Sequence, residues 1–339
     1  MKMRIKIKAK DIAKRAKVST ATVSQVFNNP GRVNSETRKM ILEIAAGMGY
    51  KRQKSTKVRL NAIGIIADNY ANVILGEFYN KVVLGILEEL KAQSINAMIE
   101  AFGKTEEVPP QMITKHLVDG ILFLGKVSRE HILMTQQKDI PLLLVGHPIP
   151  DLELHTIVSD GRSGSIQAVE HLIMLGHSKI AIISGEPAFD PVASDRLDGY
   201  RFALSKAGIK INPKYMVEAD FGVPQTSYDQ TMKLLDLDDP PTAIYCTSDS
   251  LAYRAYRAIA DRGLKIPGDI SIVGFDNISF PGYADPQLPA LTTVDVDREL
   301  MGKTSVEILT DIIENPQKAV YRYTLPVRLL IKGSTGKPK

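Results

Sequence analysis

Residues 11–28, which read DIAKRAKVSTATVSQVFN, decide the fold of the first part of this chain. Their spacing predicts two short helices joined by a tight turn, with Ser19 capping the second helix. One small core is expected from the apolar residues: Ile12, Ala13, Ala16, Val18, Val23, Val26 and Phe27. The outer side of the second helix keeps small, hydroxyl or amide side chains: Thr20, Ala21, Thr22, Ser24 and Gln25. Such side chains at an exposed helix N-terminus suit base-pair edges in a major groove, so the segment indicates DNA binding.

The charge of the chain is divided unevenly along its length. Residues 1–62 hold sixteen lysines and arginines against three acidic residues, a balance of +13. Because the whole chain has a formal net charge of +5, the remaining residues carry −8. A basic N-terminal part on an acidic remainder is typical of a nucleic-acid-binding module fused to another domain. A basic disordered tail is the alternative for residues 1–8, but residues 11–50 are too apolar and too periodic for one.

A third helix is expected to complete this unit. The first two helices should cover about 10–16 and 20–27, the second ending before the turn signal of 28–31. The third should begin at Asn34 or Ser35, with Asn34 as its cap, and close at Gly49. Lys17 occupies the tight turn, where helix-turn-helix motifs usually have glycine. A left-handed conformation there would cost roughly 1–2 kcal/mol, which a folded unit tolerates.

These residues resemble the LacI–GalR family of bacterial repressors. The matching pieces are Asp11-Ile12-Ala13, Val18-Ser19, Thr22-Val23-Ser24, Val26, Asn28, Val33 and Thr37-Arg38. The resemblance implies that bases are contacted by Thr20, Ala21 and Gln25. It implies that backbone phosphates are positioned by Ser19, Thr22, Asn28, Asn34 and Thr37. Gln25 stands where the family often has arginine, and glutamine favours adenine; the alternative is that Gln25 touches only phosphate or water.

The segment after the third helix departs from that family. Family members usually continue with a hinge helix that contains Pro-Asn, a small residue and a leucine that wedges into the minor groove. Here residues 51–61 read KRQKSTKVRLN, which lacks the Pro-Asn and leaves Leu60 as the only candidate wedge. The basic residues of this segment, Lys54 among them, predict a linker that follows phosphates and bends DNA less.

From residue 63 onward, short β-rich runs alternate with amphipathic helical runs. The expected strands fall in two sets: 63–67, 95–101, 120–124, 142–146 and 156–160, then 179–184, 216–221, 243–247, 271–276 and 291–295. Helices are expected near 77–92, 161–175, 195–207, 225–235, 249–262 and 298–314. This rhythm predicts parallel sheets with helices on both faces, in two similar lobes. The expected fold class is therefore an all-α head on a two-lobed α/β body like that of periplasmic binding proteins.

The predicted organisation has three parts. A helix-turn-helix DNA-binding head covers 1–50, a basic linker covers 51–61, and a two-lobed effector-binding and dimerisation domain covers 62–339. Within that domain, lobe 1 is expected over about 62–161 and 291–320. Lobe 2 is expected over about 162–290 and 321–334.

Small molecules bind at the carboxyl ends of parallel strands, so polar residues that follow strands are candidate ligands. A carboxylate and an arginine that fork onto vicinal hydroxyls, with aromatic rings on a sugar's apolar face, would form a saccharide site. The candidate effector-binding residues are Phe78, Tyr79, Arg196, Phe221, Ser248 and Asp276. Each has a structural alternative: Tyr79 packs, Phe221 lies in the core, and the neighbouring Asp249 caps the helix starting at Leu251.

This half of the chain resembles the same family. The matching pieces are Val118-Asp119-Gly120-Ile121-Leu122, Glu170-His171-Leu172, Leu175-Gly176-His177 and the run DISIVGFD over 269–276. The resemblance implies that Arg196, Phe221 and Asp276 are effector ligands. Ser248 stands where many members have asparagine, which removes an amide from the pocket. His171 and His177 are interpreted as structural.

Two other classes of function are alternatives: an enzyme and a sugar-binding protein. For an enzyme, Gly302-Lys303-Thr304 echoes a phosphate-binding loop, but position 297 holds Asp297 instead of the required glycine. The histidines and the single cysteine form no metal-ligand pattern, so no metal and no cofactor are expected. The second alternative is a sugar-binding protein without a DNA role, which the basic head argues against.

The same features predict where and with what the chain acts. Cys246 is a lone cysteine, and the N-terminus has no apolar leader, which favours a reduced, cytoplasmic compartment without a membrane contact. A homodimer is expected, because two heads then read a near-palindromic double-stranded operator. The prediction is a repressor whose operator affinity changes when a small molecule, a carbohydrate, binds between the lobes.

Overall fold

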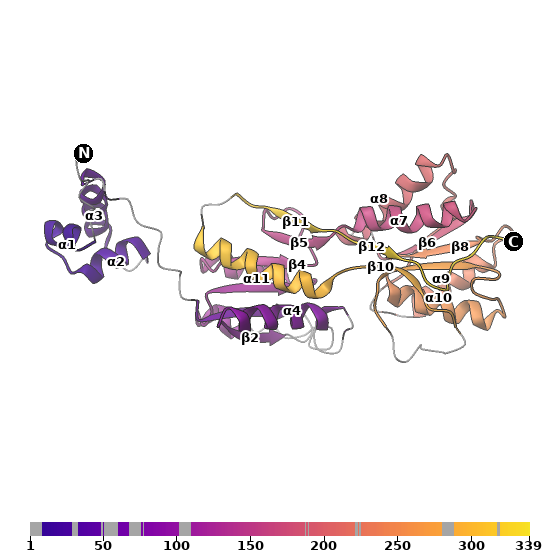
Figure 1. Ribbon diagram of the computed structural model, residues 1–339, viewed down its shortest axis with the longest axis horizontal. Coiled ribbons are helices and arrows are strands. Elements are labelled where there is room, and N and C mark those ends of the chain that lie inside the picture. Colours follow the sequence, from indigo (N-terminus) through magenta and orange to yellow (C-terminus); the bar gives the residue numbers. More distant parts are fainter. Residues whose placement is uncertain are drawn as a thin grey trace, which may run out of the picture. The chain divides into compact units, whose positions relative to one another are not determined.

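The computed structural model describes residues 9–28, 33–48, 50, 60–67, 76, 78–101, 110–186, 188, 190–220, 223, 225–279, 288–316 and 319–339. The chain divides into two compact units, Met1–Arg59 and Leu60–Lys339, which we call the head and the body (Figure 1). Two of the predicted site residues, Lys54 and Phe221, lie outside the described residues, as does most of the predicted linker.

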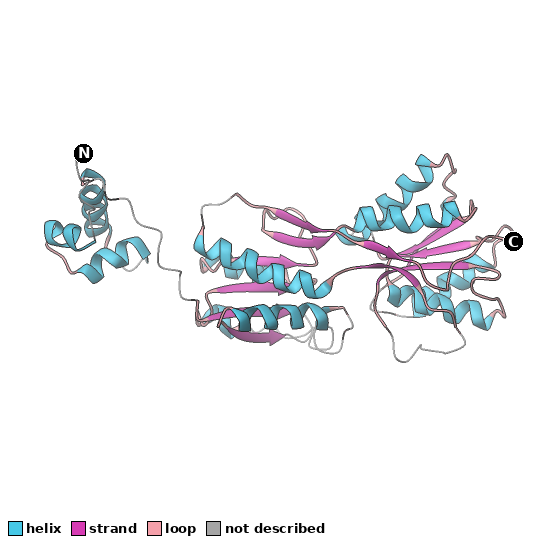
Figure 2. Cartoon of the chain, viewed as in Figure 1, coloured by secondary structure: helices cyan, strands magenta, loops and turns pink. Residues whose placement is uncertain are grey.

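The head consists of three helices around one small core. They are α1 (Ala9–Ala16), α2 (Thr20–Asn28) and α3 (Ser35–Gly47), drawn as cyan ribbons in Figure 2. Ile12, Val23 and Ile41, one from each helix, are fully buried against one another. The rest of the expected core is buried or half-buried around them: Ala13, Ala16, Val18, Val26 and Phe27. The predicted packing of this unit is confirmed.

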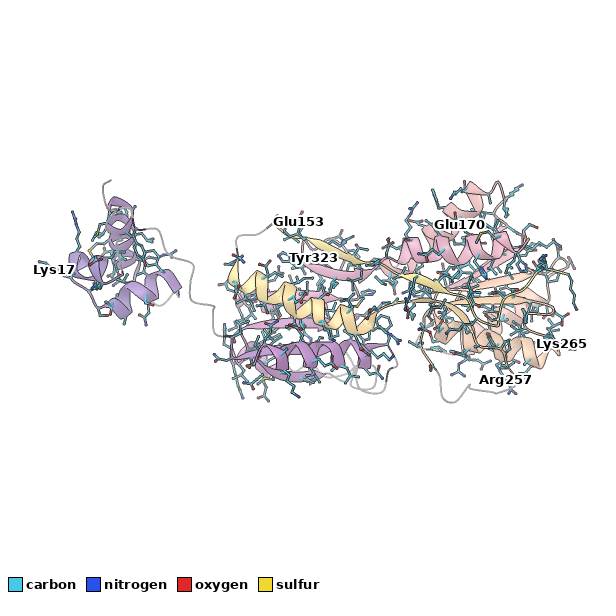
Figure 3. All side chains as sticks on the ribbon, viewed as in Figure 1. Lys17, Glu153, Glu170, Arg257, Lys265 and Tyr323 are labelled. Carbon is cyan, nitrogen blue, oxygen red and sulfur yellow. The ribbon has the colours of Figure 1, made fainter. Side chains whose placement is uncertain are left out.

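The helix ends of the head follow from short-range hydrogen bonds. Ser19 Oγ accepts a hydrogen bond from the amide of Thr22 at 2.9 Å, which caps α2. Asn34 Oδ1 does the same for the amide of Thr37 at 2.8 Å, which caps α3. Lys17, exposed and labelled in Figure 3, has a φ of 51°, so it takes the left-handed conformation that ends α1. Both predicted caps and the strained turn are confirmed.

The first lobe of the body is built on a parallel sheet. Within the described residues its six strands lie in the order β11-β5-β4-β3-β1-β2. Their bounds are β1 (Ala62–Ala67), β2 (Asn96–Ala101), β3 (Gly120–Leu124), β4 (Leu142–Val145), β5 (Thr156–Ser159) and β11 (Arg322–Leu325). The helices of this lobe are α4 (Tyr79–Ala92), α5 (Gln111–Thr114), α6 (Arg129–Gln137) and α11 (Arg298–Glu314).

Helices α4 and α11 approach each other closely, and glycines permit it. A Cβ atom on Gly85 would collide with the carbonyl of Glu299, and one on Gly302 would collide with the carbonyl of Val82. Gly302 is therefore a packing residue inside α11. Its neighbour Lys303 pairs with Glu88 at 2.9 Å. The fragment that echoed a phosphate-binding loop is part of this helix pair.

The second lobe repeats the arrangement. Its six described strands lie in the order β12-β10-β9-β8-β6-β7, and all neighbours are parallel except β12, which runs antiparallel to β10. Their bounds are β6 (Ile180–Ser184), β7 (Met216–Glu218), β8 (Ala243–Cys246), β9 (Ser271–Asp276), β10 (Thr292–Asp295) and β12 (Arg328–Leu330). Its helices are α7 (Gly161–Met174), α8 (Pro191–Lys206), α9 (Gln225–Leu235) and α10 (Asp249–Asp261).

In the described part of the body, the chain passes between the two sheets three times (Figure 1). The crossovers join β5 to α7 at Asp160, β10 to α11 at 296–297, and β11 to β12 at 326–327. The predicted lobe division is wrong in two places. Strand β10 belongs to lobe 2, because it pairs with β9, and β11 belongs to lobe 1, because it pairs with β5. Strand alternation along the chain does not reveal which sheet a strand joins.

Leu60 marks the start of the body. It is only 7% exposed, and the next two amides, of Asn61 and Ala62, donate to Asp119 Oδ2 at 2.6 and 3.1 Å. The one candidate for a minor-groove wedge is thus a buried residue of the body. Across the described residues, we found no helix with the length and apolar character needed to cross a membrane.

Candidate DNA-binding and effector sites

The predicted base-contacting residues lie on the exposed side of α2. Thr20, Ala21 and Gln25 are exposed, whereas Val23 and Val26 on the opposite side are buried in the head core. The helical period of 3.6 residues separates the two sets cleanly. The face of α2 that keeps these three side chains is therefore free to meet another molecule.

The predicted phosphate-contacting residues cluster at helix starts. Ser19 and Thr22 share a hydroxyl–hydroxyl hydrogen bond of 2.8 Å, and Asn34 and Thr37 are joined by the cap of α3. A helix N-terminus presents backbone N–H groups and a positive dipole, which attract phosphate. Asn28 is the last residue of α2, and its side chain lies outside the described residues.

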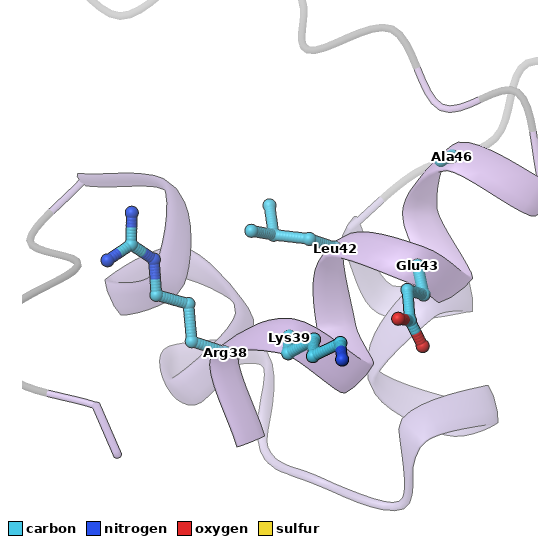
Figure 4. Close-up of a pocket in the computed structure, with 5 residues that line it drawn as sticks. All are labelled: Arg38, Lys39, Leu42, Glu43 and Ala46. Atoms are coloured by element: carbon cyan, nitrogen blue, oxygen red, sulfur yellow. The ribbon is translucent and has the colours of Figure 1, made fainter. Parts of the chain in front are cut away.

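A further exposed face of the head lies along α3. Figure 4 shows five residues of this helix lining a shallow hollow: Arg38, Lys39, Leu42, Glu43 and Ala46. They follow one another at helical spacing on the side opposite the buried Ile41 and Ala45. This face adds two cations to the head, but groups from a single helix face do not converge on a small ligand.

The effector-site candidates Arg196 and Asp276 come together in lobe 2. Arg196, from the second turn of α8, places Nη2 3.0 Å from Asp276 Oδ1, at the carboxyl end of β9. Its guanidinium carbon also lies 3.7 Å from the ring centre of Phe275, and Nη1 donates to the carbonyl of Thr247. Arg196 and Asp276 are only 6% and 7% exposed. The predicted carboxylate–arginine fork is thus assembled at a strand end.

The electrostatics of this pair are set by its burial. Burial raises the pKa of Asp276, although the neighbouring Arg196 favours the ionised carboxylate. Among the described residues, the buried Nε of Arg196 has no hydrogen-bond partner. A buried donor without a partner is costly, so this N–H suits an acceptor supplied by a bound molecule.

Tyr79, the first residue of α4, is the effector-site candidate contributed by lobe 1. Burial, and then the charges of Asp276 and Asp190, raise its pKa above the usual value for tyrosine, so its hydroxyl stays protonated. A Cβ atom on Gly146 would lie 2.7 Å from Tyr79 Oη, so the glycine after β4 makes room for the ring. Phe78 packs edge-on against Tyr79 with ring centres 5.0 Å apart.

The structure adds three residues to the site that the sequence prediction missed. Asp190 caps α8 by accepting from the amides of Val192 and Ala193 at 2.9 and 3.2 Å. Two side chains of lobe 1 reach the same carboxylate: Lys126 Nζ lies 2.9 Å from Oδ2, and His147 Nδ1 lies 3.8 Å from Oδ1. The lobes are therefore linked directly across their boundary.

The charges of this link favour a neutral His147 and an ionised Asp190. Burial lowers the pKa of His147 more than Asp190 raises it. Burial would raise the pKa of Asp190, but the hydrogen bond and charge of Lys126, together with the amide of Ala193, lower it. A signal for both lobe 1 residues was present in the sequence, because each follows a glycine directly after a strand: Gly125-Lys126 and Gly146-His147.

Ser248, predicted as an effector ligand, has the capping role that was expected of Asp249. Ser248 Oγ accepts from the amide of Leu251 at 3.4 Å and caps α10, so the interpretation of Asp249 as the cap is wrong. Asp249 is fully buried and accepts from Thr293 Oγ1 at 2.6 Å and from the amide of Ile278 at 2.8 Å. Burial, followed by the nearby Asp276, raises its pKa. Asp249 fixes the loop behind Asp276.

His171 and His177 are structural, as predicted. His171 Nε2 lies 2.9 Å from Thr335 Oγ1, and His177 Nε2 lies 2.9 Å from the carbonyl of Gly336, so both hold the C-terminal segment against lobe 2. Burial lowers the pKa of each ring, which favours the neutral form. In the described residues we found no group of three or more potential metal ligands.

The chain combines a three-helix head, whose second helix has an exposed face, with a two-lobed body that has polar groups where the lobes meet. This combination defines a helix-turn-helix transcriptional regulator. Residues 8–53 match the bacterial regulatory proteins of the lacI family, and residues 169–335 match the periplasmic binding protein-like domain. Similar proteins include the transcriptional repressor CytR of Escherichia coli strain K12, 32% identical over 96% of this chain and 95% of that protein. The ribose operon repressor of Haemophilus influenzae is 34% identical over 91% of this chain and 92% of its own length. The chain belongs to the lacI family.

Solved structures agree with this assignment. The transcriptional regulator CelR in complex with cellobiose aligns with a TM-score of 0.69 at 25% identity, over 97% of this chain and 99% of that one. A LacI family transcriptional regulator from Enterococcus faecium with bound ribose gives 0.69 at 26% identity, over 82% and 100%. The fold class of head and two-lobed body is confirmed. By name, the relative CytR is a transcriptional repressor, and the Haemophilus influenzae relative is the repressor of a ribose operon.

Proposed function

We propose that this protein is a repressor that binds a near-palindromic operator as a homodimer and responds to a polyhydroxylated effector, a sugar or nucleoside, bound between its lobes. The observation that carries the proposal is the buried Arg196–Asp276 pair at the carboxyl end of β9. The names of the relatives, one a ribose operon repressor and one a complex with cellobiose, support the same class of effector. We also propose that it acts in the cytoplasm, where operator DNA lies.

The chemistry of the pair suits two adjacent hydroxyl groups. A carboxylate accepts from hydroxyl protons while a guanidinium donates to hydroxyl oxygens, and each such charged hydrogen bond contributes about 1.5–3 kcal/mol. The unpartnered Nε of Arg196 supplies one donor. Phe78 and Tyr79 supply aromatic surface for the apolar face of a sugar or for a base. Ser248 caps α10 and directly follows Thr247, whose carbonyl accepts from Arg196 Nη1, which supports its predicted place in the site.

Asp190, Lys126 and His147 would make the site sensitive to how the lobes are closed. Their contacts exist only while lobe 1 and lobe 2 are close together. An effector that competes for Asp190, or that bridges it to Arg196, changes the free energy of closure by its different contacts in the two states. This difference is the quantity that would alter operator affinity.

In the head, we propose that Thr20, Ala21 and Gln25 contact bases. The residues at the helix starts would contact phosphates through their hydroxyls and amides: Ser19, Thr22, Asn34 and Thr37. Asn28 and the linker residue Lys54 would do the same. The exposure of the first three and the capping geometry of the others support this division. Phosphate contacts set position and salt dependence, whereas base contacts set sequence preference.

Two experiments test this function. Duplexes selected from a random pool by binding to the full-length protein should be enriched in one near-palindromic sequence. If no sequence is enriched, the regulator assignment is contradicted. A thermal-shift screen with ribose, cellobiose and ribonucleosides should give a shift that Asp276→Asn abolishes. Asp239→Asn, a matched carboxylate on the surface of the same lobe, should keep the shift. Shifts of equal size in both variants would exclude the Arg196–Asp276 pair as the site.

A further inference from the structure

Asn277, the residue after Asp276, is bonded to the segments that connect the lobes. Its side-chain Nδ2 donates to Asp295 Oδ1 at 2.8 Å, and its Oδ1 accepts from Lys332 Nζ at 2.9 Å. Its backbone carbonyl accepts from Arg298 Nη2 at 2.9 Å. Asp295 ends β10 and Arg298 begins α11, so these two partners stand on either side of the second crossover.

The third crossover is tied to the same point. In the register of the second sheet, Asp276 pairs with Asp295, and Asp295 pairs with Arg328 at the start of β12. Arg328 Nε lies 3.2 Å from Asp295 Oδ2, so Asp295 joins Asn277 on one side to Arg328 on the other. The side chains of Asn277, Asp295 and Arg328 therefore form one bonded row, which begins at the residue after Asp276 and reaches two of the three connections between the lobes.

The backbone at this row is held in an unusual conformation. Asp276 has a φ of 103° and Asn277 a φ of 49°, both in the left-handed half of the backbone map although neither is glycine. The turn is fixed from the opposite side as well, because Thr293 Oγ1 accepts from the amide of Asn277 at 3.3 Å and Asp249 accepts from the amide of Ile278. A turn held on both sides passes a displacement of Asp276 on instead of absorbing it.

From this arrangement we propose that Asn277 is a positioning residue that couples effector occupancy at Asp276 to the crossovers at 296–297 and 326–327. This inference rests on the proposed function of the Arg196–Asp276 site. Among the described residues we found no bond between Asn277 and Arg196. The side chain of Asn277 bonds to Asp295, at the start of the second crossover, and to Lys332, which follows β12. Its removal should therefore weaken communication between the site and the connections, and leave the two effector-binding side chains in place.

The test uses the full-length protein with two variants and one control. Asn277→Gly keeps the positive φ and removes the side chain, whereas Asn277→Asp keeps the size and places a second carboxylate against Asp295. The control is Asn315→Ala, which removes an amide that donates to Asp311 Oδ1 at 2.8 Å at the end of α11, away from the crossovers.

The first readout is amide hydrogen exchange without any effector. Exchange in 295–299 and 325–329 should rise about tenfold in both Asn277 variants and stay unchanged in β8 and in the control. The second readout is the ratio of operator affinities with and without saturating D-ribose. In Asn277→Gly this ratio should fall toward one, while ribose affinity and free operator affinity stay within about threefold of wild type.

The outcomes separate this inference from the proposed function. Unchanged exchange at the crossovers, or a full ribose response in Asn277→Gly, overturns the coupling role. A loss of ribose affinity equal to the loss of response also overturns it, because Asn277 would then only support the binding site. If ribose does not change the operator affinity of wild type, ribose is not the effector of this protein, and the exchange comparison decides whether Asn277 holds the crossovers.

Discussion

The head and the lobe boundary of the body are organised by interactions of very different range along the chain. The caps of the head join residues three positions apart, as in Ser19–Thr22 and Asn34–Thr37. The pair at the lobe boundary, Arg196–Asp276, joins residues 80 positions apart, and Asp249–Thr293 spans 44. Local sequence therefore determines the surface proposed for DNA, whereas the topology of two sheets determines the surface proposed for the effector.

Loss of the Arg196–Asp276 pair should have the strongest effect, because the pair holds together segments that are far apart in the sequence. Arg196→Leu removes the cation next to a carboxylate that is only 7% exposed, so the free energy of unfolding should fall by about 3–5 kcal/mol. Urea denaturation of the full-length protein measures it. Arg196→Leu combined with Asp276→Asn removes the unpaired charge and should recover part of the loss. A single variant as stable as wild type would mean that the pair is not desolvated.

A second prediction concerns the head and its proposed contacts with DNA. Gln25→Ala should change the preference at one base pair of the selected operator by about 1–3 kcal/mol, because a bidentate amide contact is lost. Competition binding with single-base operator variants measures it. Lys54→Ala serves as the comparison, since a phosphate contact should weaken all sequences alike and reduce the salt dependence. Equal behaviour of the two variants would refute the division into base and phosphate contacts.

A smaller effect tests the turn of the head. Lys17 has a φ of 51°, a conformation that glycine adopts without strain, so Lys17→Gly should stabilise the protein by about 0.5–1 kcal/mol. Lys14→Gly, in the last turn of α1, should destabilise it by about 1 kcal/mol instead. Thermal unfolding followed by circular dichroism in the helical band measures both. The same sign for the two variants would contradict the left-handed turn.

The smallest effect is the pH dependence from the two structural histidines. Burial lowers the pKa of His171 and His177, so the unfolded chain binds more protons than the folded chain as the pH falls below about 6.5. Stability should be complete above that pH and decline on acidification. The urea midpoint as a function of pH measures it, with His177→Gln expected to flatten the decline. A urea midpoint that rises on acidification would contradict the lowered pKa of both histidines.

The comparison also explains which features the sequence revealed. The head was predicted down to its caps, because capping and core residues repeat at fixed short spacings. The parallel sheets and the Arg196–Asp276 pair followed from strand ends and from the resemblance to the family. The membership of β10 and β11 in their sheets was not predictable, since crossover segments look like any other strand. The glycines after β3 and β4 mark Lys126 and His147 as strand-end residues. The sequence does not show that both reach Asp190, because the partners lie on different lobes and no local spacing connects them.

The most direct test of effector sensing at the lobe boundary is an operator titration of two proteins. Wild type and Asp276→Asn are titrated with the selected operator, with and without the compound that gave the largest thermal shift. The two proteins should bind the operator equally without the compound, because the head carries the proposed DNA contacts, and only wild type should respond to the compound. A response of equal size in Asp276→Asn would contradict the claim that the lobe boundary senses the effector.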